Sequence, residues 1–389
     1  MKQGLSARGN IKNNTAGIDW ITIGLFLALL LISIFIMNSA SSNVMEDDPN
    51  FYVNRQALFM LAGLFLVGVL IFFDYNRFRD LSNVGYVLVL ILLVLVLFIG
   101  TGDGSKRWLF GFQPSELAKL VVIVAFAAYL ERNCHKLQDP KEVFKAMAFV
   151  LAPLLLIFIE PDLGTSLVFF FFMMVMLYVS GANRKLLLLI VIAVLLMIGL
   201  IFGSLYFYTD GFTVPLEEDI PFLPLHYYQL MRLAIFINPQ MDPLDTGYHV
   251  IQSKIAIGSG GLFGQGYGQG SQVQGNFLPA HHTDFIFSVI GEEMGFFFSV
   301  FVLILYMLII LRMVKMGMEI KSMFGTLIIS GICSMLVFQV MVNVGMAIGI
   351  MPITGLPLPF FTYGGTNLLI NMLAVGLVFS VYRREKHSY

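Results

Sequence analysis

Long apolar runs limit what this chain can fold into more than any other feature of its sequence. A run of about 18 or more residues with few charges can cross a bilayer as a helix. We predict ten spans, at residues 18–38, 54–73, 82–100, 114–131, 144–160, 162–180, 185–207, 284–313, 322–350 and 364–383. Barrel strands would alternate apolar and polar residues, whereas these runs are apolar all round. The expected fold is an all-α polytopic membrane protein of about ten transmembrane helices.

Composition agrees with that fold and limits the function. Only 12% of the residues are charged, against about 25% in soluble domains, so a water-soluble protein is excluded. The net charge of -1 gives no indication of a nucleic-acid partner. No repeat with a fixed period is visible, and we expect residues 1–389 to form a single membrane domain.

Lysine and arginine residues indicate how the chain crosses the membrane. With the N-terminus inside, 17 of the 23 lysines and arginines fall on the inner side and 6 on the outer side. Because cytoplasmic loops carry such an excess, we place a tail at 1–17 and the C-terminus in the cytoplasm. The outer segments are then 39–53, 101–113, 208–283 and 351–363.

The outer segment 208–283 is unusually long. Structureless loops beyond about 15 residues are uncommon and are usually functional. We predict a short amphipathic segment at 226–237, lying at the membrane interface, and note a glycine-dense stretch at 258–270. The spacing of these glycines matches no nucleotide-binding motif. The adjacent His281 and His282 cannot share one helix face, so a zinc site is not expected.

Ionisable residues at membrane depth are candidates for function because they are costly there. Glu116 and Lys119 lie three residues apart, on one face of the fourth span. An acidic residue in the first turn of a helix also stabilises the helix dipole, so the position of Glu116 can be explained by a structural role alone. That interpretation does not explain Lys119, one turn deeper, so we favour a pair that faces a cavity.

The charged residues of two further segments can each be interpreted as structural or as functional. Glu160-Pro161-Asp162 joins the fifth and sixth spans, and Asp162 is placed to cap a helix. We favour that structural interpretation, with a functional role as the alternative. The guanidinium of Arg107 suits phosphate recognition, but an arginine beside Trp108 is somewhat more often an interfacial anchor.

Thr283 and Asp284 stand where the long outer segment re-enters the membrane. Either could simply cap the eighth span. A carboxylate at that position, however, lies at the mouth of whatever the outer segments enclose, and it could act as a general base. Glu292 and Glu293 lie deeper, and we expect one of them to face a partner inside the bundle.

The segment from Pro352 to Gly365 is too rich in proline and glycine for a regular helix. Non-helical backbone at membrane depth is tolerated only where protein or a water-filled cavity surrounds it. We therefore predict that it forms a re-entrant wall of a polar site, with contributions from Pro357, Pro359, Tyr363, Gly364 and Gly365.

Taken together, these motifs resemble the SEDS family of bacterial membrane proteins, typified by RodA and FtsW. The resemblance covers about residues 18–383. It rests on several motifs in order: Gln113-Pro114-Ser115-Glu116 with Lys119, Glu160-Pro161-Asp162-Leu163-Gly164-Thr165, Gly247-Tyr248 leading to Gln252-Ser253 and Ile257 to Gly261, His282-Thr283-Asp284-Phe285-Ile286-Phe287 with Glu292-Glu293-Met294-Gly295, and Pro352 to Gly365.

The resemblance implies a peptidoglycan glycosyltransferase that polymerises lipid II at the outer face of the bacterial cytoplasmic membrane. It also implies partners, namely a class B penicillin-binding protein and other membrane proteins of the elongation complex. The family's essential aspartate maps onto Asp284, and its polar cavity residues map onto Glu116 and Lys119. We add the following residues as candidates for binding the substrate or its pyrophosphate: Arg107, Glu160, Asp162, Thr283 and His282.

Within the family the chain looks closer to RodA than to FtsW. The pointers are Gly270-Ser271-Gln272, the stretch from Tyr228-Gln229 to Arg232, and a short N-terminus. The resemblance implies a role in cell elongation and shape, with a division-type (FtsW-like) polymerase as the alternative. No cofactor is certain, although a divalent cation, Mg or Mn, is a candidate.

Two positions depart from the family pattern. Ala280 stands where the family usually has Glu, so a catalytic role is not carried over to it. Thr362, Thr366 and Asn367 stand in place of the usual serines. Two rival functions stay open, a lipid II flippase and a non-catalytic scaffold for the penicillin-binding protein.

Overall fold

The computed structural model describes residues 17, 19–41, 50–101, 107–216, 218–220, 223, 225–244, 246–278 and 281–387. Over these residues the chain forms helices, loops and isolated β-bridges. The helices that correspond to the predicted spans are α1 (Trp20–Ser41), α2 (Phe51–Phe72), α3 (Asn76–Ile99), α4 (Pro114–Asn133), α5 (Pro140–Ile159), α6 (Leu163–Val179), α7 (Arg184–Tyr208), α11 (Ile286–Glu319), α12 (Met323–Ala347) and α13 (Gly365–His387). Each predicted span is confirmed as a helix.

Eight of these helices are long and apolar enough to cross a membrane by themselves. The other two are α4, which carries Glu116 and Lys119 near its N-terminal end, and α6, which has 17 residues. Both are packed inside the bundle against α12, which explains how a polar or a short helix is accommodated there.

The helices differ greatly in how much of their surface other helices cover. In α12 and α13, 78% and 72% of the most apolar stretch is buried, against 6% in α7. Glycines let the inner helices approach closely, since a Cβ on Gly63 of α2 would lie 2.3 Å from the Sδ atom of Met372 in α13. The core therefore lies around α12 and α13, whereas α7 presents its apolar side chains to lipid.

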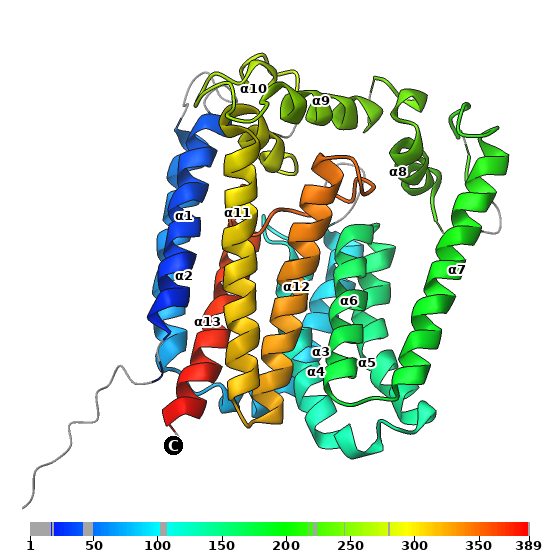
Figure 1. Cartoon of the computed structure of the whole chain (residues 1–389). Helices are drawn as coiled ribbons and strands as arrows, with labels where there is room; N and C mark the ends of the chain where they lie inside the picture. The colour runs from blue at the N-terminus through cyan, green and yellow to red at the C-terminus, as the bar shows by residue number, and fades with distance from the viewer. Residues whose placement is uncertain are drawn as a thin grey trace, which may run out of the picture.

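The long segment 208–283 contains short helices joined by loops and covers one end of the bundle (Figure 1). The predicted amphipathic segment is confirmed as α8 (Tyr227–Ile237). Two helices there were not predicted, α9 (Thr246–Ser259) and α10 (Ser271–Gln274). The short 3-10 turns are η1 (Cys134–Lys136) and η2 (Pro239–Met241). The C-terminus lies at the opposite end of the bundle (Figure 1).

A kink in α11 explains the dense glycines of the outer segment. Gly295 adopts φ 75° and ψ -173°, which interrupts the helical hydrogen bonds around it. The glycine-rich loop supplies the missing partners. Four backbone hydrogen bonds join the two segments, from Gln265 to Glu292, Gly266 to Glu293, Phe296 to Gly261 and Phe297 to Leu262. We call this contact, in which residues 261–266 bond residues 292–297 of α11, the clasp.

Glu292 and Glu293 fasten this clasp with their side chains. The carboxylate of Glu292 accepts hydrogen bonds from the N–H groups of Gln272, at 2.7 Å, and Val273, at 3.2 Å. That of Glu293 accepts the hydroxyl of Ser39 in α1 at 2.6 Å. The expectation that one of the two glutamates meets a partner inside the bundle is confirmed for Glu293.

The kink yields a prediction about stability. At the φ and ψ of Gly295 a side chain costs about 1–3 kcal/mol, and a Cβ there would lie 2.2 Å from the backbone nitrogen of Gly264. We expect Gly295→Ala to lower the melting temperature of the detergent-solubilised protein by several degrees. Gly199→Ala is the control, because nothing lies within 4 Å of its added Cβ. Equal melting temperatures for the two variants would contradict the clasp.

Candidate active site

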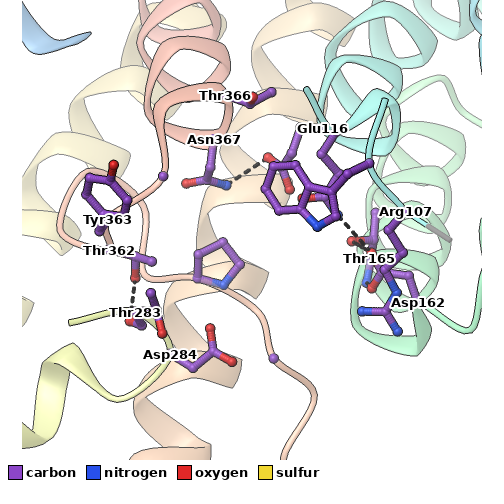
Figure 2. Close-up of a pocket in the computed structure, with 15 residues that line it drawn as sticks. Arg107, Glu116, Asp162, Thr165, Thr283, Asp284, Thr362, Tyr363, Thr366 and Asn367 are labelled. Atoms are coloured by element: carbon purple, nitrogen blue, oxygen red, sulfur yellow. Dashed lines mark hydrogen bonds between the residues drawn. The ribbon is translucent and has the colours of Figure 1, made fainter. Parts of the chain in front are cut away.

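A polar cavity of about 290 Å³ opens at the end of the bundle that the long segment 208–283 covers. Its lining comes from the loop before α4, the first turns of α4, α6 and α13, the loop before α11, and the non-helical segment before α13 (Figure 2). The lining residues are Arg107, Trp108, Gln113, Glu116, Asp162, Thr165, Thr283, Asp284, Gly355, Pro357, Thr362, Tyr363, Gly364, Thr366 and Asn367.

Eight of the residues predicted for the site line this cavity: Arg107, Glu116, Asp162, Thr283, Asp284, Pro357, Tyr363 and Gly364. Five lie outside its lining: Lys119, Glu160, His282, Pro359 and Gly365. Sequence reasoning did not name Trp108, Gln113, Thr165 and Gly355 as site residues. All four lie next to, or within three residues of, a predicted one, so each belongs to a motif that was recognised.

Glu116 and Lys119 form a buried ion pair rather than a pair that faces the cavity. The Nζ atom of Lys119 lies 2.8 Å from the Oε1 atom of Glu116, and both side chains are almost fully buried. Asn367 donates to the other carboxylate oxygen of Glu116 at 2.7 Å (Figure 2). Pro114 at the first helical position brings the pair to the start of α4. Only Glu116 reaches the cavity, which corrects the predicted placement of Lys119.

Asp162 both caps a helix and lines the cavity. Its carboxylate accepts the N–H of Thr165 at 3.1 Å and the hydroxyl of Thr165 at 2.9 Å. The predicted N-cap of α6 is therefore confirmed. The cap turns the carboxylate toward the open space, where Gln113 approaches it at 3.4 Å.

Glu160 is buried at the end of α5, and no side-chain or backbone donor in the described part of the chain bonds either of its carboxylate oxygens. Burial, and secondarily the charge of Asp162, raise the pKa of Glu160 to about 8, while Arg107 opposes the shift. The Glu160 side chain is therefore mainly protonated at neutral pH, and it lies behind the cavity rather than in it.

Arg107 ties the loop before α4 to the turn between α5 and α6. Its Nε atom donates to the carbonyl of Glu160 at 3.1 Å, and a second nitrogen donates to the carbonyl of Pro161. The same guanidinium lines the cavity. It therefore does more than anchor the chain at the interface, and it is a positive group that an anionic ligand in the cavity could reach.

The backbone around Asp284 is held by the wall and by α12. The carbonyl of Asp284 accepts the side-chain amide of Asn343 at 2.8 Å. The carbonyl of Thr283 accepts the hydroxyl of Thr362 at 3.0 Å (Figure 2). The N–H of Tyr363 donates to the carbonyl of His282 at 3.1 Å. Three consecutive peptide units are thus fixed from outside α11.

The carboxylate of Asp284 is left facing the cavity. α11 begins at Ile286, and its N-terminus has no side-chain cap, so Asp284 does not serve as one. Figure 2 shows Asp284 on one side of the cavity and Arg107 with Asp162 on the other. The pKa of Asp284 is raised, mainly because the carboxyl group is buried, and the charge of Asp162 adds to this increase. The positive charges of Arg232 and Arg107 oppose it. Arg232 was not among the predicted site residues.

The predicted wall is confirmed as non-helical from Pro352 to Gly364, whereas Gly365 is the first residue of α13. Pro359 is buried and its carbonyl accepts the hydroxyl of Tyr306. A Cβ on Gly365 would lie 2.5 Å from the ring of Phe59, so this glycine lets α13 pack against α2. Both residues support the wall without forming its surface.

His282 belongs to an aromatic cluster beside the cavity. Its ring lies 4.9 Å from that of Tyr52, which contacts Tyr363 at 4.7 Å. Burial, and secondarily His281, lower the pKa of His282 to about 4, so the ring is neutral at neutral pH.

Over the described residues, no three His, Cys, Asp or Glu side chains come together closely enough to hold a metal ion. These residues do not fit a metal centre built by the protein alone, and the divalent cation stays a prediction. Ala280 lies outside the described residues.

Comparison with known proteins gives extensive matches. The family model described as "Cell cycle protein", which covers FtsW, RodA and SpoVE, matches residues 17–387. The peptidoglycan glycosyltransferase RodA of Treponema pallidum is 33% identical, over 94% of this chain and 98% of the relative. The stage V sporulation protein E of Bacillus subtilis is 34% identical, over 95% and 98%. The peptidoglycan glycosyltransferase MrdB of Escherichia coli is 36% identical, over 73% and 72%.

Solved structures match over the same length. A chain from a peptidoglycan synthase complex that coordinates polymerization and crosslinking aligns with a TM-score of 0.76 and 31% identity, covering 95% of this chain and 98% of that one. The rod shape determining protein RodA of Thermus thermophilus aligns with a TM-score of 0.67 and 29% identity, covering 95% and 97%. Because sequence and fold both match from one end of the described bundle to the other, this chain belongs to the FtsW/RodA/SpoVE (SEDS) family of peptidoglycan glycosyltransferases.

Proposed function

We propose that the outer cavity is where this enzyme joins lipid II molecules into glycan strands, at the outer face of the cytoplasmic membrane. The observation that carries the proposal is the Asp284 carboxylate, which faces the cavity opposite Arg107. Relatives named RodA and MrdB favour a role in cell elongation and shape. Relatives named FtsW, at 31–32% identity, make a division-type polymerase the second candidate.

In the proposed step the 4-hydroxyl of an acceptor sugar attacks the anomeric carbon of a lipid-linked donor. The bond from that carbon to the pyrophosphate oxygen breaks, and undecaprenyl pyrophosphate leaves. Asp284 accepts the proton that the hydroxyl loses. Arg107 lies across the cavity, where its charge would stabilise the negative charge that grows on the leaving group.

Lys119 has a different role in this proposal from the one first expected. Its ammonium group is bound to Glu116 and does not line the cavity. We propose that it balances the charge of Glu116, which in turn holds Asn367 of α13. The pair would then be a support for the cavity rather than a contact to pyrophosphate.

The position of the cavity favours a polymerase over a flippase. Transporters bind their substrate near the midplane of the membrane, where it can be reached from both sides in turn. Here the lining residues come from one end of the helices, which we propose to be the outer end. Fluorescent lipid II separates the three candidate functions: polymer supports an enzyme, translocation without polymer a flippase, and neither of these a scaffold.

The partners are proposed from chemistry and likeness. A solved relative belongs to a complex that combines polymerization with crosslinking. Glycan strands made by this chain would need such crosslinking, and a class B penicillin-binding protein is the proposed partner, within an assembly of other elongation-complex membrane proteins.

The proposal predicts the effect of removing the base. Asp284→Asn should lower lipid II polymerisation by about 100-fold or more, because the proton acceptor is lost. Asp210→Asn removes the same charge from an exposed outer turn and is the control. Full activity of the Asp284 variant would refute its role as a base.

The pH dependence follows from the same residue. Since burial raises the pKa of Asp284, a base at this position should lose activity as the pH falls, starting above the range in which an exposed aspartate titrates. An initial-rate profile of the wild-type enzyme checks this, and a rate independent of pH on the acidic side would contradict it.

The buried ion pair gives a prediction that concerns stability. Lys119→Met should destabilise the protein by about 3–5 kcal/mol, because the Glu116 carboxylate is left buried without its countercharge. The double variant Glu116→Gln, Lys119→Met should recover much of that loss. Thermal unfolding in detergent measures both, and a double variant no more stable than the single one would contradict the pairing.

The proposed orientation can be tested with the chain's own Cys134, which lies in η1 at the end of the bundle opposite the cavity. In intact spheroplasts, a membrane-impermeant maleimide should label Cys134 only after permeabilisation. It should label a Leu244→Cys variant directly, because Leu244 is 92% exposed in the outer segment. The reverse pattern would place the cavity in the cytoplasm.

A further inference from the structure

We infer that Arg232 of α8 is a positioning residue that keeps the carboxyl group of Asp284 ionised and able to accept a proton. The inference rests on the proposed role of Asp284 as the base. It concerns a residue of the long outer segment that does not line the cavity, and it gives α8 a part in the reaction.

The position of Arg232 is the first observation. α8 lies at the covered end of the bundle, beside α7 (Figure 1), and Arg232 borders a small cleft whose lining includes Pro161, Leu163 and Thr354. Asp162, which stands between Pro161 and Leu163, and Gly355, which follows Thr354, line the main cavity instead. The cleft and the cavity therefore lie on the two faces of the same two thin backbone segments.

Asp284 lies directly on the other side of one of these segments. A Cβ built on Gly355 would come within 3.5 Å of the Oδ2 atom of Asp284. Gly355 is the residue after Thr354, which borders the cleft of Arg232. Because Gly355 has no side chain, the carboxylate of Asp284 lies close to the backbone of the segment that also borders the cleft of Arg232.

The distribution of charge is the second observation. The charged groups around Asp284 are Arg232 on α8, Arg107 on the loop before α4, and Asp162 at the start of α6. Arg107 is bound to two backbone carbonyls, and Asp162 is held by Thr165. Glu116 also lines the cavity, and its charge is balanced by Lys119.

Arg232 differs from these groups because, among the described residues, its guanidinium makes neither a hydrogen bond like those of Arg107 nor a salt bridge like that of Lys119. Charges that are shielded from water act over longer distances than exposed ones, and Arg232 is half-buried. Among the charged groups near Asp284 it has the largest effect in favour of the ionised carboxylate. Burial works against ionisation, and Arg232 counteracts it.

A structural role for Arg232 and direct contact with the substrate are the alternatives. A structural arginine would bind a carboxylate or carbonyl of a neighbouring segment, as Arg107 does. A residue that binds pyrophosphate would line the cavity. Arg232 fits neither description, whereas a charge placed behind the wall acts on Asp284 without occupying the space that the sugar needs.

The decisive experiment compares the pH dependence of lipid II polymerisation by the full-length enzyme, purified with its partner, in wild type, Arg232→Gln and Arg232→Lys. We expect the acidic limb of the Arg232→Gln profile to move to higher pH. Activity at neutral pH should then fall several-fold and recover at alkaline pH, while Arg232→Lys keeps the wild-type profile. A uniform loss of activity with an unmoved acidic limb would overturn the inference.

A second variant guards against a folding defect in Arg232→Gln. Gln229 lies one turn before Arg232 in the same cleft and accepts the N–H of His226 at 3.1 Å, a bond that glutamate also makes. Gln229→Glu adds a negative charge beside the arginine and should move the acidic limb in the same direction. An unmoved limb in this variant, with normal thermal stability, would also overturn the inference.

A readout that does not depend on catalysis separates this inference from the proposed function. A hydrophobic carbodiimide modifies protonated carboxyl groups, and peptide mass spectrometry reports the extent of modification at Asp284 as a function of pH. We expect the midpoint to rise in Arg232→Gln and to stay unchanged in Arg55→Gln, whose arginine stacks on Phe51 at the start of α2. If the midpoint does not rise, the inference fails. If it rises while Asp284→Asn retains polymerisation, the proposed function fails instead.

Discussion

A lipid bilayer offers no hydrogen-bond partner to a peptide group, so each non-helical segment near the membrane must be satisfied by the rest of the chain. Two such segments shape this protein. The kink of α11 at Gly295 is satisfied by the glycine-rich loop, and the wall between α12 and α13 is satisfied in part by Thr362 and Asn343. The outer end of the bundle can therefore be irregular and still be rigid.

This arrangement suits the role proposed for the carboxylate of Asp284. The carbonyl groups of residues 282–284 accept hydrogen bonds from residues of the wall and of α12. The side chain of Asp284 is then left to face the cavity, at a position set by backbone contacts. A site supported in this way keeps its geometry before the substrate arrives, which is what proton transfer to a fixed base requires.

Charge is arranged around the cavity in layers. Lys119 lies beneath it and neutralises Glu116, which lines it. On its surface, Arg107 faces two carboxylates, those of Asp162 and Asp284. Behind its wall, Arg232 adds a positive charge that reaches Asp284 through the backbone near Gly355. The buried Glu160 is mainly uncharged at neutral pH and so adds little repulsion. The cavity can then accept an anionic substrate without an excess of negative charge.

The sequence by itself determined the membrane fold, the positions of the helices and most of the site. Apolar runs are long and local, so each span could be read directly, and the helix cap at Asp162 follows from neighbouring residues alone. The glycine-rich stretch was recognised, but its role depends on a kink more than twenty residues away in the chain. Helix α9 was missed because its apolar residues follow no strong helical period, and α10 because it has only four residues.

Only the tertiary structure decided which polar residues share the cavity and which lie behind it. Lys119 was expected to face the cavity because of its spacing from Glu116, but a buried ammonium group gains most by binding that carboxylate. Arg232 belongs to a stretch that pointed to RodA, but nothing local indicated its effect on Asp284, which exists only where α8 packs behind the wall. Spacing along one helix is a property of the sequence, whereas the side of a wall on which a charge lies depends on how distant segments pack.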